Sequence, residues 1–118
     1  AELLYKDRTM LGQILETFVF QELKRQAGWS DRPVQFYHFR DKDGVEVDMV
    51  LEQAGRIAGV EVKAAATVTG KDFRGLRKLR ESTGERFAAG VLIYDGENVA
   101  GFGESIYAVP VRVIWEMD

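Results

Sequence analysis

The sequence predicts an α/β protein in which a mixed sheet carries helices on its faces. Apolar residues recur at helical spacing in two segments, residues 9–27 and 71–83. Between these segments lie three stretches rich in β-branched and aromatic residues, and a mostly apolar stretch follows the second one. Three strands in series, followed by a strand beyond a helix, are typical of a mixed sheet with helices packed on it.

Composition limits the classes of function. The 118 residues suffice for one compact domain, and no apolar run approaches the roughly 18 residues that a membrane helix needs. The absence of cysteine excludes a disulfide scaffold, a thiol nucleophile and thiolate zinc ligands, and it fits a reducing cytoplasm. The net charge of −3 gives no general attraction to nucleic acid, so such binding would need a local basic patch.

The first half of the chain predicts one helix and a β-hairpin. Thr9 is a suitable N-cap for the helix of residues 9–27, and Gly28 follows it as a stop. Residues 34–40 form the first predicted strand and residues 45–52 the returning one. The sequence Asp-Gly at positions 43 and 44, which lies between them, is a strong hairpin signal.

The second half continues the sheet. The third strand is predicted at 56–64, and the helix of 71–83 follows it. Residues 87–94 are apolar enough for a central strand covered on both faces. Short strands are expected near 99–102 and 106–109, and Pro110 should open a last segment of undetermined type.

Charged residues interrupt two of the predicted strands. Strand side chains alternate between faces, so Glu46 and Asp48 should share one face, with Val47 and Met49 on the other. Glu61 and Lys63 should share one face of the third strand, and hairpin pairing would bring them near Asp48. Isolated charges in an apolar strand cost several kcal/mol each unless they are compensated. Compensation could come from a Glu61–Lys63 salt bridge at the sheet edge, or from a bound ion.

The pattern of Asp48 followed by Glu61-Val62-Lys63 resembles the P-D-(D/E)-x-K nuclease superfamily, although Val47 stands where the superfamily has proline. This resemblance implies a restriction endonuclease-like α-β-β-β-α-β core, here with extra short C-terminal strands. It also implies that Asp48, Glu61 and Lys63 are catalytic. Asp48, Glu61 and the Val62 carbonyl would then be oxygen ligands for Mg²⁺ or Mn²⁺, which activates water and stabilises phosphate charge. Clustered acids repel, so at least one of the two carboxyls should have a raised pKa unless Lys63 offsets it.

Acids on the first predicted helix could extend this ligand set. The superfamily often adds a glutamate from that helix, and on this resemblance Glu16 is the preferred additional metal ligand. Glu22 lies nearer the centre of the apolar stripe and stays open on geometry, because a carboxylate embedded in an apolar face is a good candidate for pointing at an ion. Glu46 is a further candidate acid.

A more specific resemblance covers roughly residues 9–115. The segments "ILETFVFQELKRQ", "FYHFRDKDGVEVDMVLE" and "GVEVKAAATVTGKDFRGLRKL" are similar to the uncharacterised C-terminal domain of prokaryotic AAA-type ATP-binding proteins. This resemblance implies that residues 1–118 are one nuclease-like domain. Because the chain also begins at Ala1, we expect it to be a fragment of a longer protein. ATP would bind only in the upstream ATPase module, because this chain has no G-x-x-x-x-G-K-[ST] motif.

Two functions follow as hypotheses. The first is a metal-dependent nuclease or phosphodiesterase domain, in which Lys71, Arg74 and Lys78, on one face of the second helix, would contact nucleic-acid phosphates. The second is a non-catalytic module of the same fold, which would bind nucleic acid, another subunit or the ATPase. The apolar segment of residues 106–115 could also pack at a homodimer interface, and no association with a membrane is expected.

Overall fold

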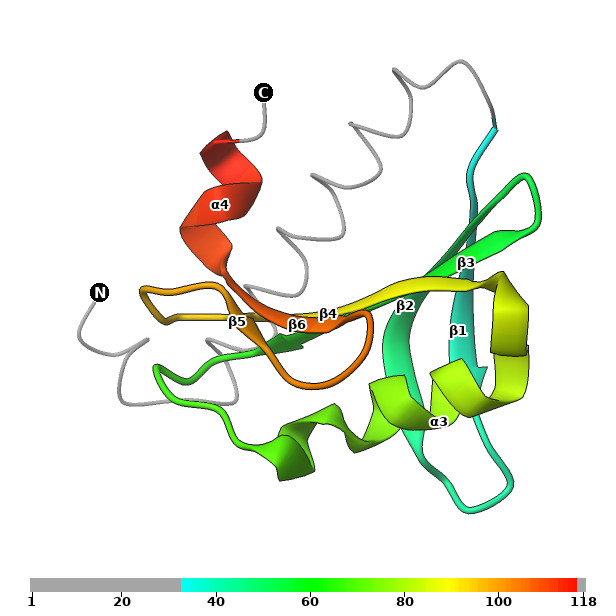
Figure 1. Ribbon diagram of the computed structural model, residues 1–118, viewed down its shortest axis with the longest axis horizontal. Coiled ribbons are helices and arrows are strands. Elements are labelled where there is room, and N and C mark those ends of the chain that lie inside the picture. The colour runs from blue at the N-terminus through cyan, green and yellow to red at the C-terminus, as the bar shows by residue number, and fades with distance from the viewer. Residues whose placement is uncertain (1–32, 117–118) are drawn as a thin grey trace.

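In the computed structural model, residues 33–116 are described, and they build one mixed sheet with helices at its faces (Figure 1). The strand order is β1-β2-β3-β4-β6-β5. The strands are β1 (Gln35–Arg40), β2 (Glu46–Gln53), β3 (Arg56–Lys63), β4 (Phe87–Tyr94), β5 (Ala100–Gly101) and β6 (Ile106–Pro110). The helical segments are η1 (Gly70–Phe73), α3 (Arg74–Thr83), η2 (Gly84–Arg86) and α4 (Val111–Glu116). The helix predicted at 9–27 lies outside the described residues.

The pairing of the strands confirms the predicted mixed sheet. β1 with β2 and β2 with β3 are antiparallel, whereas β4 pairs in parallel with both β3 and β6. The short β5 is antiparallel to β6. The turn between β1 and β2 uses Gly44 at a φ of 83°, a left-handed conformation that glycine adopts without strain. The Asp41 carboxylate stabilises this turn by accepting hydrogen bonds from the backbone N–H groups of Asp43 and Val45, at 2.9 and 2.8 Å.

The core occupies both faces of the sheet. On one face η1 presents Phe73 and α3 presents Leu76 and Leu79, which are fully or almost fully buried against the strands. Burying side chains of this size stabilises the fold by about 1.5–3 kcal/mol each. The opposite face buries Met49, Val60 and Ile93, and Val111 at the start of α4 packs there, so α3 and α4 lie on opposite sides of the sheet (Figure 1).

The position of β4 explains its composition. Leu92 packs on the α3 side and Ile93 on the other side, so both faces of this strand are covered, as its apolar sequence predicts. The helix predicted at 71–83 is present, whereas the prediction that Pro110 opens the last segment was wrong. The first turn of the 71–83 helix is the 3-10 segment η1, and Pro110 ends β6, where it pairs with Tyr94. The segment after Pro110 is the helix α4.

No helix within residues 33–116 is long and apolar enough to cross a membrane.

Candidate functional site

The site is organised by an irregularity in the ladder between β1 and β2. Two steps along β1 correspond to three steps along β2, so β2 contains one extra residue at this point. The bulge lies between the pairs Tyr37–Val50 and Phe39–Val47, and it leaves Asp48 and Met49 opposite His38. Bulges of this kind bend a strand and redirect its side chains, and they are frequent beside active sites.

The bulge overturns the regular alternation predicted for β2. Val47 packs in the cluster under α3, whereas Met49 packs in the cluster on the opposite face. In an unbroken strand these two side chains would share a face. The extra residue therefore changes the direction of the β2 side chains at Asp48.

The Asp48 carboxylate bonds to the backbone of β3. The last ladder pair between β2 and β3 is Met49–Val60, and beyond it Asp48 Oδ2 accepts a hydrogen bond from the Val62 N–H at 3.2 Å. A side-chain oxygen thus replaces a main-chain acceptor where the two strands stop pairing. The N–H and C=O of one strand residue point toward the same neighbouring strand. The Val62 carbonyl consequently faces the side on which Asp48 lies.

Glu61 reaches the α3 side of β3 because Gly75 leaves room for it. A Cβ atom at Gly75 would lie 2.5 Å from Glu61 Oε1 and 2.4 Å from the Glu46 carbonyl oxygen. Within the described part of the chain, no group donates a hydrogen bond or ion pair to the Glu61 carboxylate. Among residues 33–116, this half-buried carboxylate at the first turn of α3 therefore has no compensating charge.

Both predicted acids have raised pKa values. Burial and, after it, the negative charges of Asp48 and Asp72 together raise the pKa of Glu61 to about 8. Burial also raises the pKa of Asp48, although the Val62 N–H opposes that rise. The expected rise is thus present in both carboxyls, and the charge of Asp48 contributes to the rise at Glu61.

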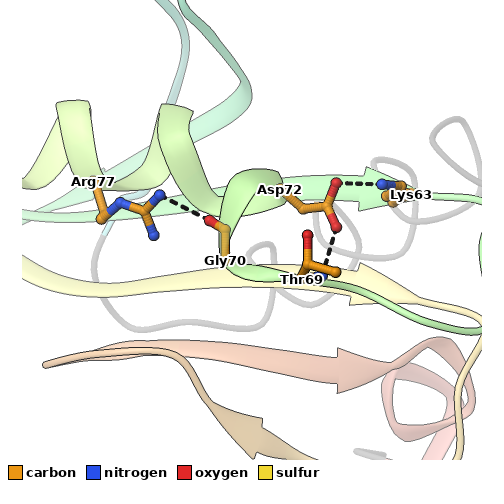
Figure 2. A network of polar contacts seen from close by, with 5 residues as sticks. All are labelled: Lys63, Thr69, Gly70, Asp72 and Arg77. Carbon is orange, nitrogen blue, oxygen red and sulfur yellow. Dashed lines mark hydrogen bonds and ion pairs between the residues drawn. The ribbon is translucent and has the colours of Figure 1, made fainter.

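Lys63 is held by an acid that the sequence interpretation did not select. Its ammonium forms an ion pair with Asp72 Oδ1, and Asp72 Oδ2 accepts a hydrogen bond from the Thr69 N–H at 2.8 Å (Figure 2). Burial raises the pKa of Asp72, but the hydrogen bonds from Lys63 and Thr69 and the Lys63 charge together hold it below its usual value. The salt bridge considered between Glu61 and Lys63 is not formed.

A local signal for Asp72 was present in the sequence. Thr69-Gly70-Lys71-Asp72 has the spacing of a capping box, in which the acid at the third helical position bonds back to the N-cap backbone. Asp72 therefore fixes the start of η1 and binds Lys63 at the same time. Nearby, Arg77 donates a hydrogen bond to the Gly70 carbonyl at 2.8 Å, which ties the first turn of α3 to η1 (Figure 2).

The remaining acids of the predicted ligand set lie elsewhere. Glu46 is exposed and its Oε1 lies 3.8 Å from Arg40 Nε, in a surface ion pair. Glu16 and Glu22 lie outside the described residues. Across residues 33–116, no three side chains of His, Asp or Glu gather closely enough to hold a metal ion by themselves. The two carboxyls that do influence each other are those of Asp48 and Glu61, and carboxylate oxygens are ligands of Mg²⁺, which usually keeps several waters.

The predicted basic residues begin beside this cluster. Lys71 precedes Asp72 in η1, and Arg74 and Lys78 follow on α3. Lys71 and Arg74 are exposed and Lys78 is half-buried, and none of the three forms an ion pair with any described residue. As far as residues 33–116 show, these three cations are therefore available to an external anion, and Lys71 is adjacent to the Asp72 that binds Lys63.

Replacing Gly75 with alanine is expected to destabilise the fold by about 1–3 kcal/mol, because the added methyl group overlaps backbone and cannot be accommodated by a rotamer change. In an open helix the same change would stabilise by up to about 1 kcal/mol. Gly70→Ala is the matched control, since a Cβ there meets nothing within 4 Å. Urea unfolding of both variants measures the difference, and equal stability for the two would contradict the close approach of α3 to β2 and β3.

Comparison with known families places the chain in one of them. A family model described as a domain of unknown function (DUF4143) matches residues 11–114, so the chain belongs to that family. No curated protein matches the chain.

Proposed function

We propose that this chain is a divalent-metal-dependent, nuclease-like phosphodiesterase domain with a restriction endonuclease-like core. The observation that carries the proposal is the pair of half-buried carboxyls, Asp48 and Glu61, which lie together where the ladder between β2 and β3 ends. Burial raises both pKa values, and within residues 33–116 Lys63 pairs with Asp72 and not with either of these carboxyls. A cation from solution would supply the missing charge.

The roles of the residues follow from their chemistry. Asp48, Glu61 and the Val62 carbonyl would hold Mg²⁺ or Mn²⁺, with Glu16 as an additional ligand by resemblance to the nuclease superfamily. The bound ion lowers the pKa of a coordinated water and stabilises charge on a phosphate. Lys63 carries an ammonium beside these ligands, where it would orient the attacking water or balance the charge that develops on the phosphate.

We further propose the setting in which the domain acts. The resemblance described above supports a C-terminal position in an AAA-type ATPase of the cytoplasm, with ATP bound only by the upstream module. Self-association through the C-terminal segment is less favoured by the packing, because Ile106 and Ala108 are buried inside this chain, although Tyr107 remains 43% exposed.

The test of the proposed function is cleavage of labelled single- and double-stranded DNA and RNA by the chain in Mg²⁺ or Mn²⁺. We expect cleavage that depends on the ion and is lost in Asp48→Asn. The control variant is Glu85→Gln, which removes an exposed carboxylate on η2, beside the N-terminal end of β4. No cleavage together with no metal binding would favour the alternative, a non-catalytic module that binds nucleic acid or protein.

Reversing the charges of Arg74 and Lys78 to glutamate is expected to weaken nucleic-acid binding and flatten its salt dependence. Each lost phosphate contact should reduce the slope of log affinity against log salt by about 1. Filter binding or fluorescence anisotropy at several salt concentrations measures this slope. Arg56→Glu is the control, because Arg56 is exposed at the other end of β3 from Lys63. An unchanged slope in the double variant, or an equal change in the control, would contradict a phosphate-binding face on α3.

A further inference from the structure

We infer that Asp72 is a positioning residue for Lys63, which it anchors to the start of η1 and thereby keeps from neutralising Glu61. This inference rests on the proposed function of Asp48 and Glu61 as ligands of a divalent cation. Asp72 is neither a ligand nor a residue that would touch the substrate in this scheme. It acts through Lys63.

The contacts of Asp72 make it a rigid anchor. One carboxylate oxygen binds the Lys63 ammonium while the other accepts the Thr69 N–H at 2.8 Å, so the carboxylate is fixed from two sides (Figure 2). The side chain of Asp72 is only 17% exposed, whereas that of Lys63 is 42% exposed. A lysine on a flexible four-carbon stem is thus held at one point of the fold, and its other N–H donors are left for water or a phosphate oxygen.

Asp72 has a positioning role because Lys63 pairs with it and not with Glu61. Glu61 is two residues from Lys63 on the same face of β3, which makes it the nearest acid along the strand. Lys63 nevertheless pairs with Asp72, and no ion pair links it to Glu61 or Asp48. Since Asp72 balances the Lys63 charge, the carboxyls of Asp48 and Glu61 remain available to a divalent cation.

Removing only the charge of Asp72 separates this role from helix capping. In Asp72→Asn the amide oxygen can still accept the Thr69 N–H, but the ion pair with Lys63 is lost. We expect Lys63 to become mobile or to move to Glu61, and Mn²⁺ affinity to fall by about 10- to 100-fold. In a Lys63→Met background the same change should leave Mn²⁺ affinity within about twofold, because there is no ammonium left to misplace.

The experiment uses the 118-residue chain as wild type, Asp72→Asn, Lys63→Met and the double variant, with Glu81→Gln on α3 as the charge control. NMR relaxation of the Lys63 side chain reports its order, exchange of the Thr69 amide reports the cap, and calorimetry reports Mn²⁺ affinity. Disordering of Lys63 with a protected Thr69 amide, and a loss of affinity that requires Lys63, would support the inference.

The experiment distinguishes failure of this inference about Asp72 from failure of the proposed function. If wild type binds Mn²⁺ but Lys63 relaxes identically in Asp72→Asn, or the loss of affinity persists without Lys63, Asp72 is not a positioning residue. If wild type binds no Mn²⁺ at all, the proposed function is refuted, whatever the order of Lys63.

Discussion

Glu61→Gln is expected to stabilise the metal-free chain at pH 8 and to remove most of the pH dependence of its unfolding between pH 5 and 8. The reason is that burial and the charges of Asp48 and Asp72 raise the pKa of Glu61 from 4.5 to about 8 in the folded state. An amide of the same shape carries no charge to desolvate, so the variant avoids the penalty that ionisation imposes on the wild type.

The sign follows from proton binding. Below the unfolded pKa of Glu61 the carboxyl is protonated in both states and pH has no effect on stability. As the pH rises toward 8 the unfolded chain ionises while the folded chain keeps its proton, so the free energy of unfolding falls. The side chain is partly exposed, and solvent screening reduces the expected loss to about 1–3 kcal/mol. The raised pKa of Asp48 adds a smaller slope of the same sign.

Urea unfolding of wild type and Glu61→Gln at pH 5, 6, 7 and 8 measures this effect, with Glu81→Gln as the control for removing an exposed acid from α3. A wild-type stability that rises across this range, or an identical slope in Glu61→Gln, would show that Glu61 does not carry a strongly raised pKa.

Lys63→Ala is expected to reduce phosphodiester cleavage by about 100- to 1,000-fold while leaving Mn²⁺ affinity close to that of wild type. Lysine is not a metal ligand, and its contribution is to stabilise charge that develops at the reacting phosphate or to orient water. Asp48→Asn and Glu61→Gln should instead lose both cleavage and Mn²⁺ binding, because each removes a charged oxygen ligand.

Single-turnover cleavage and Mn²⁺ calorimetry on the same preparations measure the two properties separately. Arg56→Ala, an exposed cation at the far end of β3, is the control for a general loss of positive charge. Cleavage by Lys63→Ala within about threefold of wild type would contradict the catalytic role given to Lys63. A loss of Mn²⁺ binding as large as that of Asp48→Asn would also contradict it.

Much of the fold could be predicted from local sequence patterns. The predicted strand at 87–94 coincides with β4, because a run covered on both faces must be apolar throughout. The hairpin of β2 and β3 also followed, because two strands joined by a short turn pair with each other. The bulge at Asp48 could not be predicted, since "VEVDMV" has regular alternation and the extra residue appears only in the pairing with β1.

The candidate site was predictable in part for the same reasons. Hairpin pairing brought Asp48 near Glu61, and the structure places their carboxyls close enough to repel each other. The ion pair between Lys63 and Asp72 could not be predicted, because it depends on where η1 begins relative to the end of β3, which is a tertiary relationship. The capping-box spacing indicated a backbone contact for Asp72 but gave no sign of Lys63.

The most direct test of the central claim, that Asp48 and Glu61 together bind a divalent cation, is calorimetric titration of Mn²⁺ and Mg²⁺ at pH 7 in buffers of different ionisation enthalpy. With a pKa of about 8, Glu61 is mostly protonated at this pH, so binding must displace its proton. We predict saturable binding by wild type with release of about one proton per ion, and no such binding by Asp48→Ala. Absence of binding by wild type, or binding that releases no proton and survives Asp48→Ala, would contradict the claim.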